Sequence, residues 1–61
     1  MDNKLKDRLN LFLDELEVPI TKICKKIMLS PQSLYDWRKD RLKLSDGTLK
    51  RIDDYLKKYG F

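Results

Sequence analysis

Residues 20–37 read ITKICKKIMLSPQSLYDW, and the apolar residues of this stretch decide the fold. Those of its first half follow the i, i+3, i+4, i+7 spacing of one helix face: Ile20, Ile23, Cys24 and Ile27. The periodicity stops before Pro31 and restarts with Leu34 and Trp37, which are three residues apart. The pattern therefore predicts two short helices, with Leu34 and Trp37 as core residues of the second.

The junction between these two helices carries a helix-start signal. Ser30 can act as the N-cap, because its hydroxyl can accept a hydrogen bond from a backbone N–H of the first turn. Pro31 suits the first helical position, where its fixed φ is helical and its missing N–H costs nothing. Two short helices joined by about three residues form a helix-turn-helix layout, whose second helix enters the major groove of DNA. We expect this unit to cover about residues 19–39.

A further helix is predicted on each side of this unit. The upstream one should end near Glu17, and its apolar stripe consists of Leu5, Leu9, Phe12, Leu13 and Leu16. Leu11 lies off the stripe and is expected to be partly exposed or used by a neighbouring chain. Downstream, Ser45 or Asp46 can cap a last helix, and Gly60 is suited to end it. The expected fold is all-α, with four short helices in a single domain covering residues 1–61.

The pattern resembles the helix-turn-helix of phage repressor and Cro proteins, the lambda-repressor-like family. That family tends to place a small residue in the first helix, a glycine four residues later, an apolar residue, and a serine- or threonine-led recognition helix with two apolar anchors. In this chain the corresponding residues are Cys24, Met28, Leu29, Ser30, Leu34 and Trp37. The resemblance covers roughly residues 18–56 and implies a lambda-repressor-like DNA-binding domain.

Met28 departs from the family pattern, because the family favours a glycine with positive φ at this position. A positive φ strains a residue that has a Cβ atom. We therefore expect the turn to be formed with a negative φ at Met28, and its side chain to be buried.

The net charge of +4 is unevenly distributed along the chain. Residues 1–18 carry three basic and five acidic side chains, a balance of −2. Residues 19–43 carry seven basic and two acidic side chains, a balance of +5, and residues 44–61 carry four and three, a balance of +1. The excess lies on the predicted helix-turn-helix, as expected for a nucleic-acid binder. A solvated helical surface would by itself also explain a mild excess.

Composition argues against several other classes of function. One cysteine and no histidine leave a zinc site or a Cys/His catalytic pair without its residues, so we expect no metal, no cofactor and no enzyme activity. The chain has no apolar run of membrane-spanning length and no signal-peptide pattern, which favours a cytoplasmic protein of a bacterium or a phage-infected bacterium. Cys24 is expected to behave as a small buried hydrophobe. The length leaves no room for an effector-binding domain, so no small-molecule ligand is expected.

The candidates for contacts with DNA bases lie in the second helix of the unit. Gln32 is the foremost, because it lies in the first turn and a glutamine amide can pair bidentately with adenine. By the resemblance, Pro31, Gln32 and Asp36 occupy base-reading positions, and Ser33 can bond a base or a phosphate. Asp36 either accepts from a cytosine amine or pairs with Arg38 or Lys39, and we favour the pairing with Lys39 at i, i+3.

Each candidate for a phosphate contact carries either a positive charge or, in the case of Thr21, a hydroxyl in the first turn of the first helix of the unit. They are Thr21, Lys22, Lys25, Lys26, Arg38, Lys39, Arg41 and Lys43. Such contacts position a protein on DNA without reading its sequence. About half of the basic residues are expected to contact DNA, and the rest to keep the surface solvated.

An aromatic cluster at the end of the chain has two interpretations. Tyr55, Tyr59 and Phe61 either close the core or form the interface of a weak homodimer, because tyrosine and phenylalanine are enriched at interfaces.

The expected function is sequence-specific binding of double-stranded DNA by a small regulator of transcription of the repressor/Cro type. The alternatives are a DNA-binding antitoxin, an excisionase-like accessory factor, or a helical protein-interaction module without DNA binding.

Overall fold

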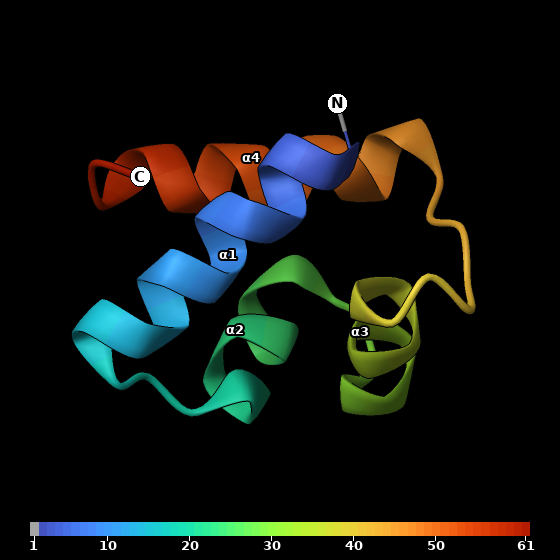
Figure 1. Cartoon of the computed structure of the whole chain (residues 1–61), viewed down its shortest axis with the longest axis horizontal. Helices are drawn as coiled ribbons and strands as arrows, with labels where there is room; N and C mark the ends of the chain where they lie inside the picture. Colours follow the sequence, from blue (N-terminus) through green and yellow to red (C-terminus); the bar gives the residue numbers. More distant parts are fainter. Residues whose placement is uncertain (1) are drawn as a thin grey trace.

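The computed structural model of the protein describes residues 2–61 and is all-helical over that range. Its four helices are α1 Asp2–Leu16, α2 Ile20–Ile27, α3 Pro31–Arg38 and α4 Asp46–Lys58. α1 crosses α4 along one side of the molecule, and α2 and α3 lie on the other side (Figure 1). The prediction of an all-α fold with four short helices is confirmed. Over these residues, no helix combines the length and apolar character needed to cross a lipid bilayer.

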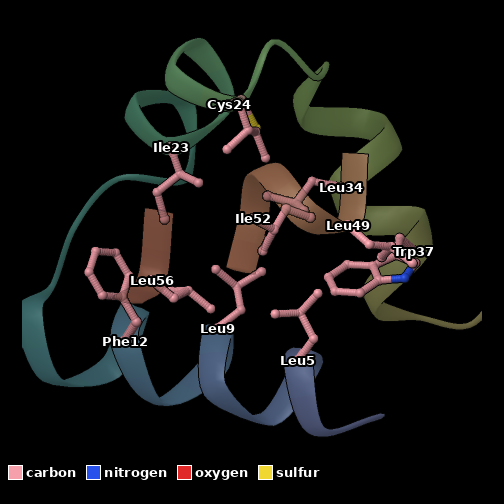
Figure 2. Packing of buried hydrophobic residues seen from close by; sticks show 11 residues of the cluster. Leu5, Leu9, Phe12, Ile23, Cys24, Leu34, Trp37, Leu49, Ile52 and Leu56 are labelled. Atoms are coloured by element: carbon pink, nitrogen blue, oxygen red, sulfur yellow. The ribbon is translucent and has the colours of Figure 1, made fainter. Parts of the chain in front are cut away.

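All four helices contribute to one apolar core. Its members are Leu5, Leu9, Phe12, Ile23, Cys24, Ile27, Leu34, Trp37, Leu49, Ile52 and Leu56. The three side chains of α1 lie in a row and point toward the other helices, with Phe12 near one end of the core and Trp37 near the other (Figure 2). Fully burying a large apolar side chain contributes about 1.5–3 kcal/mol, so these contacts account for most of the driving force for folding. The prediction that Leu34 and Trp37 are core residues is confirmed.

The predicted stripe of α1 is correct except at its last member. Leu5, Leu9 and Phe12 are buried, but the side chain of Leu16 is 45% exposed. Leu16 is the last residue of the helix, and the chain turns directly after it at Glu17, which has a φ of 50°. Leu11 is 51% exposed, as its position off the stripe predicts.

The starts of α3 and α4 follow from capping by serine. The Ser30 hydroxyl accepts a hydrogen bond from the backbone N–H of Ser33 at 3.1 Å, and Pro31 is the first helical residue. The Ser45 hydroxyl accepts from the backbone N–H of Thr48 at 3.3 Å. The Ser30 cap was expected from the sequence, which left Ser45 and Asp46 open as caps of α4, and the structure has Ser45. α2 starts differently, because Pro19 lies immediately before it and has no side chain able to cap.

Each of the four helices is followed closely by a residue with positive φ. The values are 50° at Glu17, 57° at Met28, 61° at Asp40 and 82° at Gly60. After α2, α3 and α4, the residue that follows the positive-φ residue donates its backbone N–H to the carbonyl oxygen five residues earlier. The three distances are 3.0, 2.8 and 2.9 Å respectively. This is a Schellman-type ending, which requires a left-handed residue. The predicted role of Gly60 is therefore confirmed.

The prediction of a negative φ at Met28 is wrong. The left-handed conformation lets the backbone N–H of Leu29 reach the carbonyl oxygen of Cys24, which closes the end of α2. The expected burial of Met28 is also wrong, since its side chain is 75% exposed. Tertiary packing therefore gains little from methionine at this position, and the backbone strain is not offset by burial.

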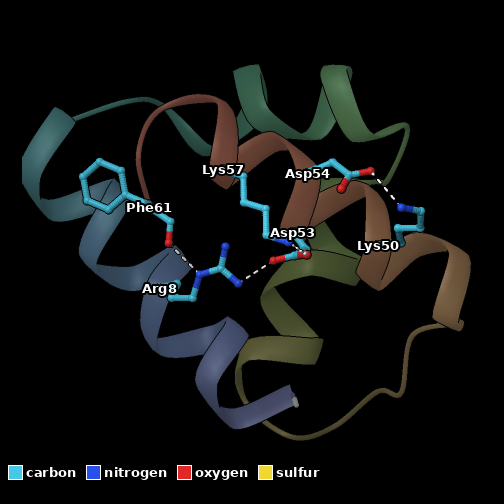
Figure 3. A network of polar contacts seen from close by, with 6 residues as sticks. All are labelled: Arg8, Lys50, Asp53, Asp54, Lys57 and Phe61. Carbon is cyan, nitrogen blue, oxygen red and sulfur yellow. Dashed lines mark hydrogen bonds and ion pairs between the residues drawn. The ribbon is translucent and has the colours of Figure 1, made fainter.

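The C-terminal end is attached to α1 through Arg8. Its Nε donates to the carbonyl oxygen of Phe61 at 2.6 Å, and its Nη1 donates to the carboxylate of Asp53 (Figure 3). Lys57 also pairs with Asp53, at 3.1 Å. Two hydrogen bonds hold the pKa of Asp53 below its usual value: the one from Arg8 has the larger effect, and the one from Lys57 the smaller. This network fastens α1 to α4 on the outer side of the core.

Candidate nucleic-acid interface

The junction of α2 and α3 is held against α4 by an arginine. Arg51 of α4 donates from Nε to the carbonyl oxygen of Ile27, the last residue of α2, at 3.0 Å. Its Nη2 lies 3.2 Å from Oγ1 of Thr48, which is itself buried. The cation also interacts favourably with the negative end of the α2 dipole. α3 is fixed on its other side by the buried Leu34 and Trp37.

A groove of about 410 Å³ separates α2 from the first turn of α3. Its lining includes Thr21 and Lys25, which are one helical turn apart on α2, and Ser30 and Pro31 at the start of α3. Cys24 is at its base but is only 4% exposed, and burial raises the pKa of its thiol. A protonated, buried thiol is a poor nucleophile, so the groove offers hydroxyl and ammonium groups for binding.

The outward face of α3 carries the candidates for base contacts. Pro31 and Gln32 are exposed, whereas Ser33 and Asp36 are half-buried. The amide nitrogen of Gln32 donates to Oδ1 of Asp36 at 3.1 Å, one helical turn away. The hydroxyl of Ser30 donates to that of Ser33 at 2.8 Å, so Ser33 is tied to the cap.

The expected pairing of Asp36 with Lys39 or Arg38 is wrong. Nζ of Lys39 lies 5.7 Å from the ring centroid of Tyr35, and the guanidinium of Arg38 bonds to Asn10 of α1. Gln32 takes the place of these cations as the partner of Asp36. The carboxylate thus orients a neutral amide on the exposed face and neutralises neither cation.

The candidates for phosphate contacts are distributed over several parts of the surface. Seven are exposed: Thr21, Lys22, Lys25, Lys26, Lys39, Arg41 and Lys43. Lys25 borders the groove beside α3, whereas Lys26 borders a second groove of about 210 Å³ next to Arg51 and Lys58 of α4. The α2 lysines therefore face different sides of the molecule, and only part of the set can contact one DNA duplex at the same time.

The aromatic candidates for an interface pack against the core. Ring centroids of Tyr55, Tyr59 and Phe61 lie 5.7, 5.5 and 5.4 Å from that of Phe12. This arrangement supports the core-closing interpretation. Tyr59 nevertheless remains 51% exposed, so part of the cluster faces solvent.

Sequence reasoning missed the contribution of α1 to this surface. The side chain of Lys6 pairs with Asp40 and lies 5.3 Å from the ring centroid of Trp37. Asn10 bonds to Arg38 and, with Tyr35 and Lys39, lines a crevice of about 190 Å³. Neither role has a local sequence signal, because both partners are about 30 residues away and residues 1–18 are acidic overall.

Among residues 2–61, no group of three acidic, cysteine or histidine residues is placed to hold a metal ion. Comparisons with models of protein families, with curated proteins and with solved structures find no match to this chain. Function is therefore inferred from the fold and from the chemistry of the surface.

Proposed function

We propose that this protein binds double-stranded DNA through α2 and α3 as a lambda-repressor-like helix-turn-helix domain, and that it regulates transcription in a bacterium or phage. One observation carries the proposal. The first turn of α3 is exposed beside Thr21 and Lys25, on the segment that holds the positive charge excess of +5. An exposed helix start with cations beside it matches the way recognition helices enter the major groove.

The backbone at Met28 is consistent with the resemblance. Its φ is 57°, the left-handed conformation. The resemblance implies a glycine with positive φ at this position. The chain thus has the backbone conformation implied by the resemblance, although the residue departs from it.

The side chains of α3 would contact the DNA bases and so determine which sequence is bound. Gln32 would offer its amide to an adenine, with Asp36 fixing the amide orientation through their 3.1 Å hydrogen bond. Pro31 and Ser33 would contact neighbouring bases or the sugar. Asp36 would then be close to the phosphates, so its negative charge would lower affinity for every sequence, and the oriented amide would add discrimination.

Affinity would come mainly from phosphate contacts. The candidates nearest to α3 are Thr21, Lys25, Arg38 and Lys39, and the exposed loop residues Arg41 and Lys43 extend the set. Occupancy of the DNA would then block or recruit polymerase. A homodimer is the proposed binding form, because one short recognition helix makes too few base contacts to select one site in a genome.

The test is the salt dependence of binding to duplex DNA. If four to six phosphates are neutralised, log K falls with log salt at a slope of roughly −4 to −5 per monomer bound. Lys25→Gln should reduce the magnitude of the slope by about 1. Lys50→Gln, the same charge change at an exposed position on α4, serves as the control and should leave the slope unchanged. A slope near zero for the unaltered protein would reject DNA as the partner and favour a protein-interaction module.

Selection of bound duplexes from a random pool would complete the test. A palindromic motif supports a dimeric regulator and separates it from an accessory factor that binds DNA with little sequence preference.

A further inference from the structure

The crevice between α1 and α3 has an unusual set of lining groups. Asn10, Tyr35, Arg38 and Lys39 surround a volume of about 190 Å³. All four side chains carry hydrogen-bond donors, two carry a positive charge and none carries a carboxylate. Such a lining disfavours cations and favours an oxyanion.

The hydrogen bonds inside the crevice leave further donors of the same two side chains unused. Nε and Nη2 of Arg38 both donate to Oδ1 of Asn10, at 3.0 and 2.7 Å. The carbonyl oxygen of Asn10 is therefore occupied, and its amide nitrogen faces away from the arginine. Within residues 2–61 that amide nitrogen and Nη1 of Arg38 make no hydrogen bond. The ammonium of Lys39 lies 5.7 Å from the ring centroid of Tyr35, and both residues line the crevice.

We propose that this crevice binds one phosphate of the DNA backbone, through the Asn10 amide, Nη1 of Arg38 and the Lys39 ammonium. The inference rests on the proposed function and extends it, because it makes α1 part of the DNA-binding surface. Charge-assisted hydrogen bonds from a guanidinium and an ammonium are the strongest that a phosphate oxygen receives from a protein.

The location of the crevice suits a phosphate that flanks the major groove. It lies at the C-terminal end of α3, whereas the groove with Thr21 and Lys25 lies at the N-terminal end. The eight residues of α3 span about 12 Å, which is similar to the width of the major groove. Phosphate contacts at both ends of α3 would hold it in a single register, and Asn10 would be a positioning residue for it.

Asn10→Asp is the decisive variant. Aspartate keeps the oxygen that accepts from Arg38 and adds charge assistance, so α3 stays attached to α1 and the thermal midpoint should be unchanged or higher. The same change replaces the amide donors with a carboxylate that repels phosphate. Asn3→Asp, on α1 about 10 Å away along the helix, is the control for adding one negative charge to that helix. The probe is a duplex of about 20 base pairs and arbitrary sequence, because phosphate contacts do not depend on sequence.

The expected result is that Asn10→Asp weakens binding roughly tenfold relative to Asn3→Asp and reduces the magnitude of the salt slope by about 1. Asn10→Ala removes a neutral donor and leaves both cations, so it should weaken binding less than Asn10→Asp with the slope nearly unchanged. It decides the matter if the aspartate variant fails to fold, because unchanged binding by Asn10→Ala would then overturn the inference. Equal binding by the two aspartate variants, or weaker binding by Asn10→Asp with an unchanged slope, would overturn the inference and leave DNA binding intact. A slope near zero for the unaltered protein would instead overturn the proposed function, and this inference with it.

Discussion

Nε of Arg51 on α4 lies 3.0 Å from the carbonyl oxygen of Ile27, the last residue of α2. This bond satisfies a helix-terminal carbonyl and places a cation at the negative end of the helix dipole. Arg51→Ala is expected to lower the free energy of unfolding by about 1–2 kcal/mol, since a hydrogen bond from a charged donor is lost. Urea unfolding followed by circular dichroism measures the change.

The neighbouring Lys50 provides the control for this prediction. It is exposed and pairs with Asp54 at 3.5 Å, one turn along α4. Surface pairs at this spacing contribute about 0.3–0.5 kcal/mol, so Lys50→Ala should change stability little. Equal effects of the two substitutions would show that the Arg51–Ile27 bond does not stabilise the α2–α3 junction.

Met28→Gly is expected to stabilise the protein by about 1 kcal/mol. Met28 has a φ of 57° and a side chain that is 75% exposed, so glycine relieves backbone strain and sacrifices little burial. The greater freedom of glycine in the unfolded chain reduces the gain but does not reverse it. Met28→Ala, which shortens the side chain and keeps the strain, should lie within a few tenths of a kcal/mol of the unaltered protein. A lower thermal midpoint for the glycine variant would contradict this account.

Local chemistry made the helix starts predictable in this chain. Ser30 and Pro31 specify the beginning of α3 by capping and by a fixed φ, and both act within one turn. The backbone at Met28 was not predictable in this way, because its side chain disfavours the left-handed conformation that the end of α2 requires. At this position the side chain favours a negative φ, whereas the hydrogen bond that ends α2 requires a positive φ.

The sequence predicted which residues of α3 are buried and which are exposed, but it did not predict which side chains form hydrogen bonds with each other. Burial of Leu34 and Trp37 follows from periodicity, and it leaves Gln32 on the outward face. The partner of Arg38 does not follow from any local rule, because Asn10 is 28 residues away and meets it only through the packing of α1. Charged side chains reach many partners, so tertiary structure decides which of them they contact.

Stability at low pH should depend on Asp53. Hydrogen bonds from Arg8 and Lys57 lower its pKa in the folded protein, so its contribution is fully present above the unfolded value of about 4 and is lost as the pH falls through the lower folded value. The difference in urea midpoint between the unaltered protein and Asp53→Asn should therefore be constant from about pH 5 to 7 and shrink below about pH 4. A difference that persists at pH 2 would assign the effect to something other than ionisation.

Asp36→Ala is expected to change the affinity for DNA of any sequence and the preference for particular base pairs in opposite directions. The substitution removes a negative charge near the proposed phosphate contacts and releases the amide of Gln32 from its 3.1 Å hydrogen bond. Binding to duplexes of arbitrary sequence should become tighter, and preference at the base pair read by Gln32 should weaken by up to about 1–3 kcal/mol. Gln32→Ala should lose the same preference without tighter general binding. Unchanged preference in both variants would mean that Gln32 reads no base.

The proposed homodimer would use the surface around Phe12, where two exposed apolar side chains lie close together. Leu11 and Tyr59 are each 51% exposed, and the ring centroid of Tyr59 lies 5.5 Å from that of Phe12, the residue next to Leu11 in α1. Phe61 is less suited to a test, because its ring packs on Phe12 and its carbonyl oxygen binds Arg8. The small size of the surface implies a dimer that is weak in solution and forms fully on DNA.

Two recognition helices related by a two-fold axis would reach half-sites about 34–36 Å apart, one turn of DNA. Duplexes with one or two copies of the selected half-site, titrated with the unaltered protein, should show cooperative binding only to the pair. A Leu11→Gln, Tyr59→Ser double variant should keep its affinity for the single half-site and lose the cooperativity, because both side chains are half exposed in the monomer. Leu42→Gln, at a 40% exposed leucine in the loop before α4, is the matched control and should remain cooperative. Equal affinity of the unaltered protein for one and two half-sites would indicate a monomeric binder, and cooperativity retained in the double variant would place the interface elsewhere.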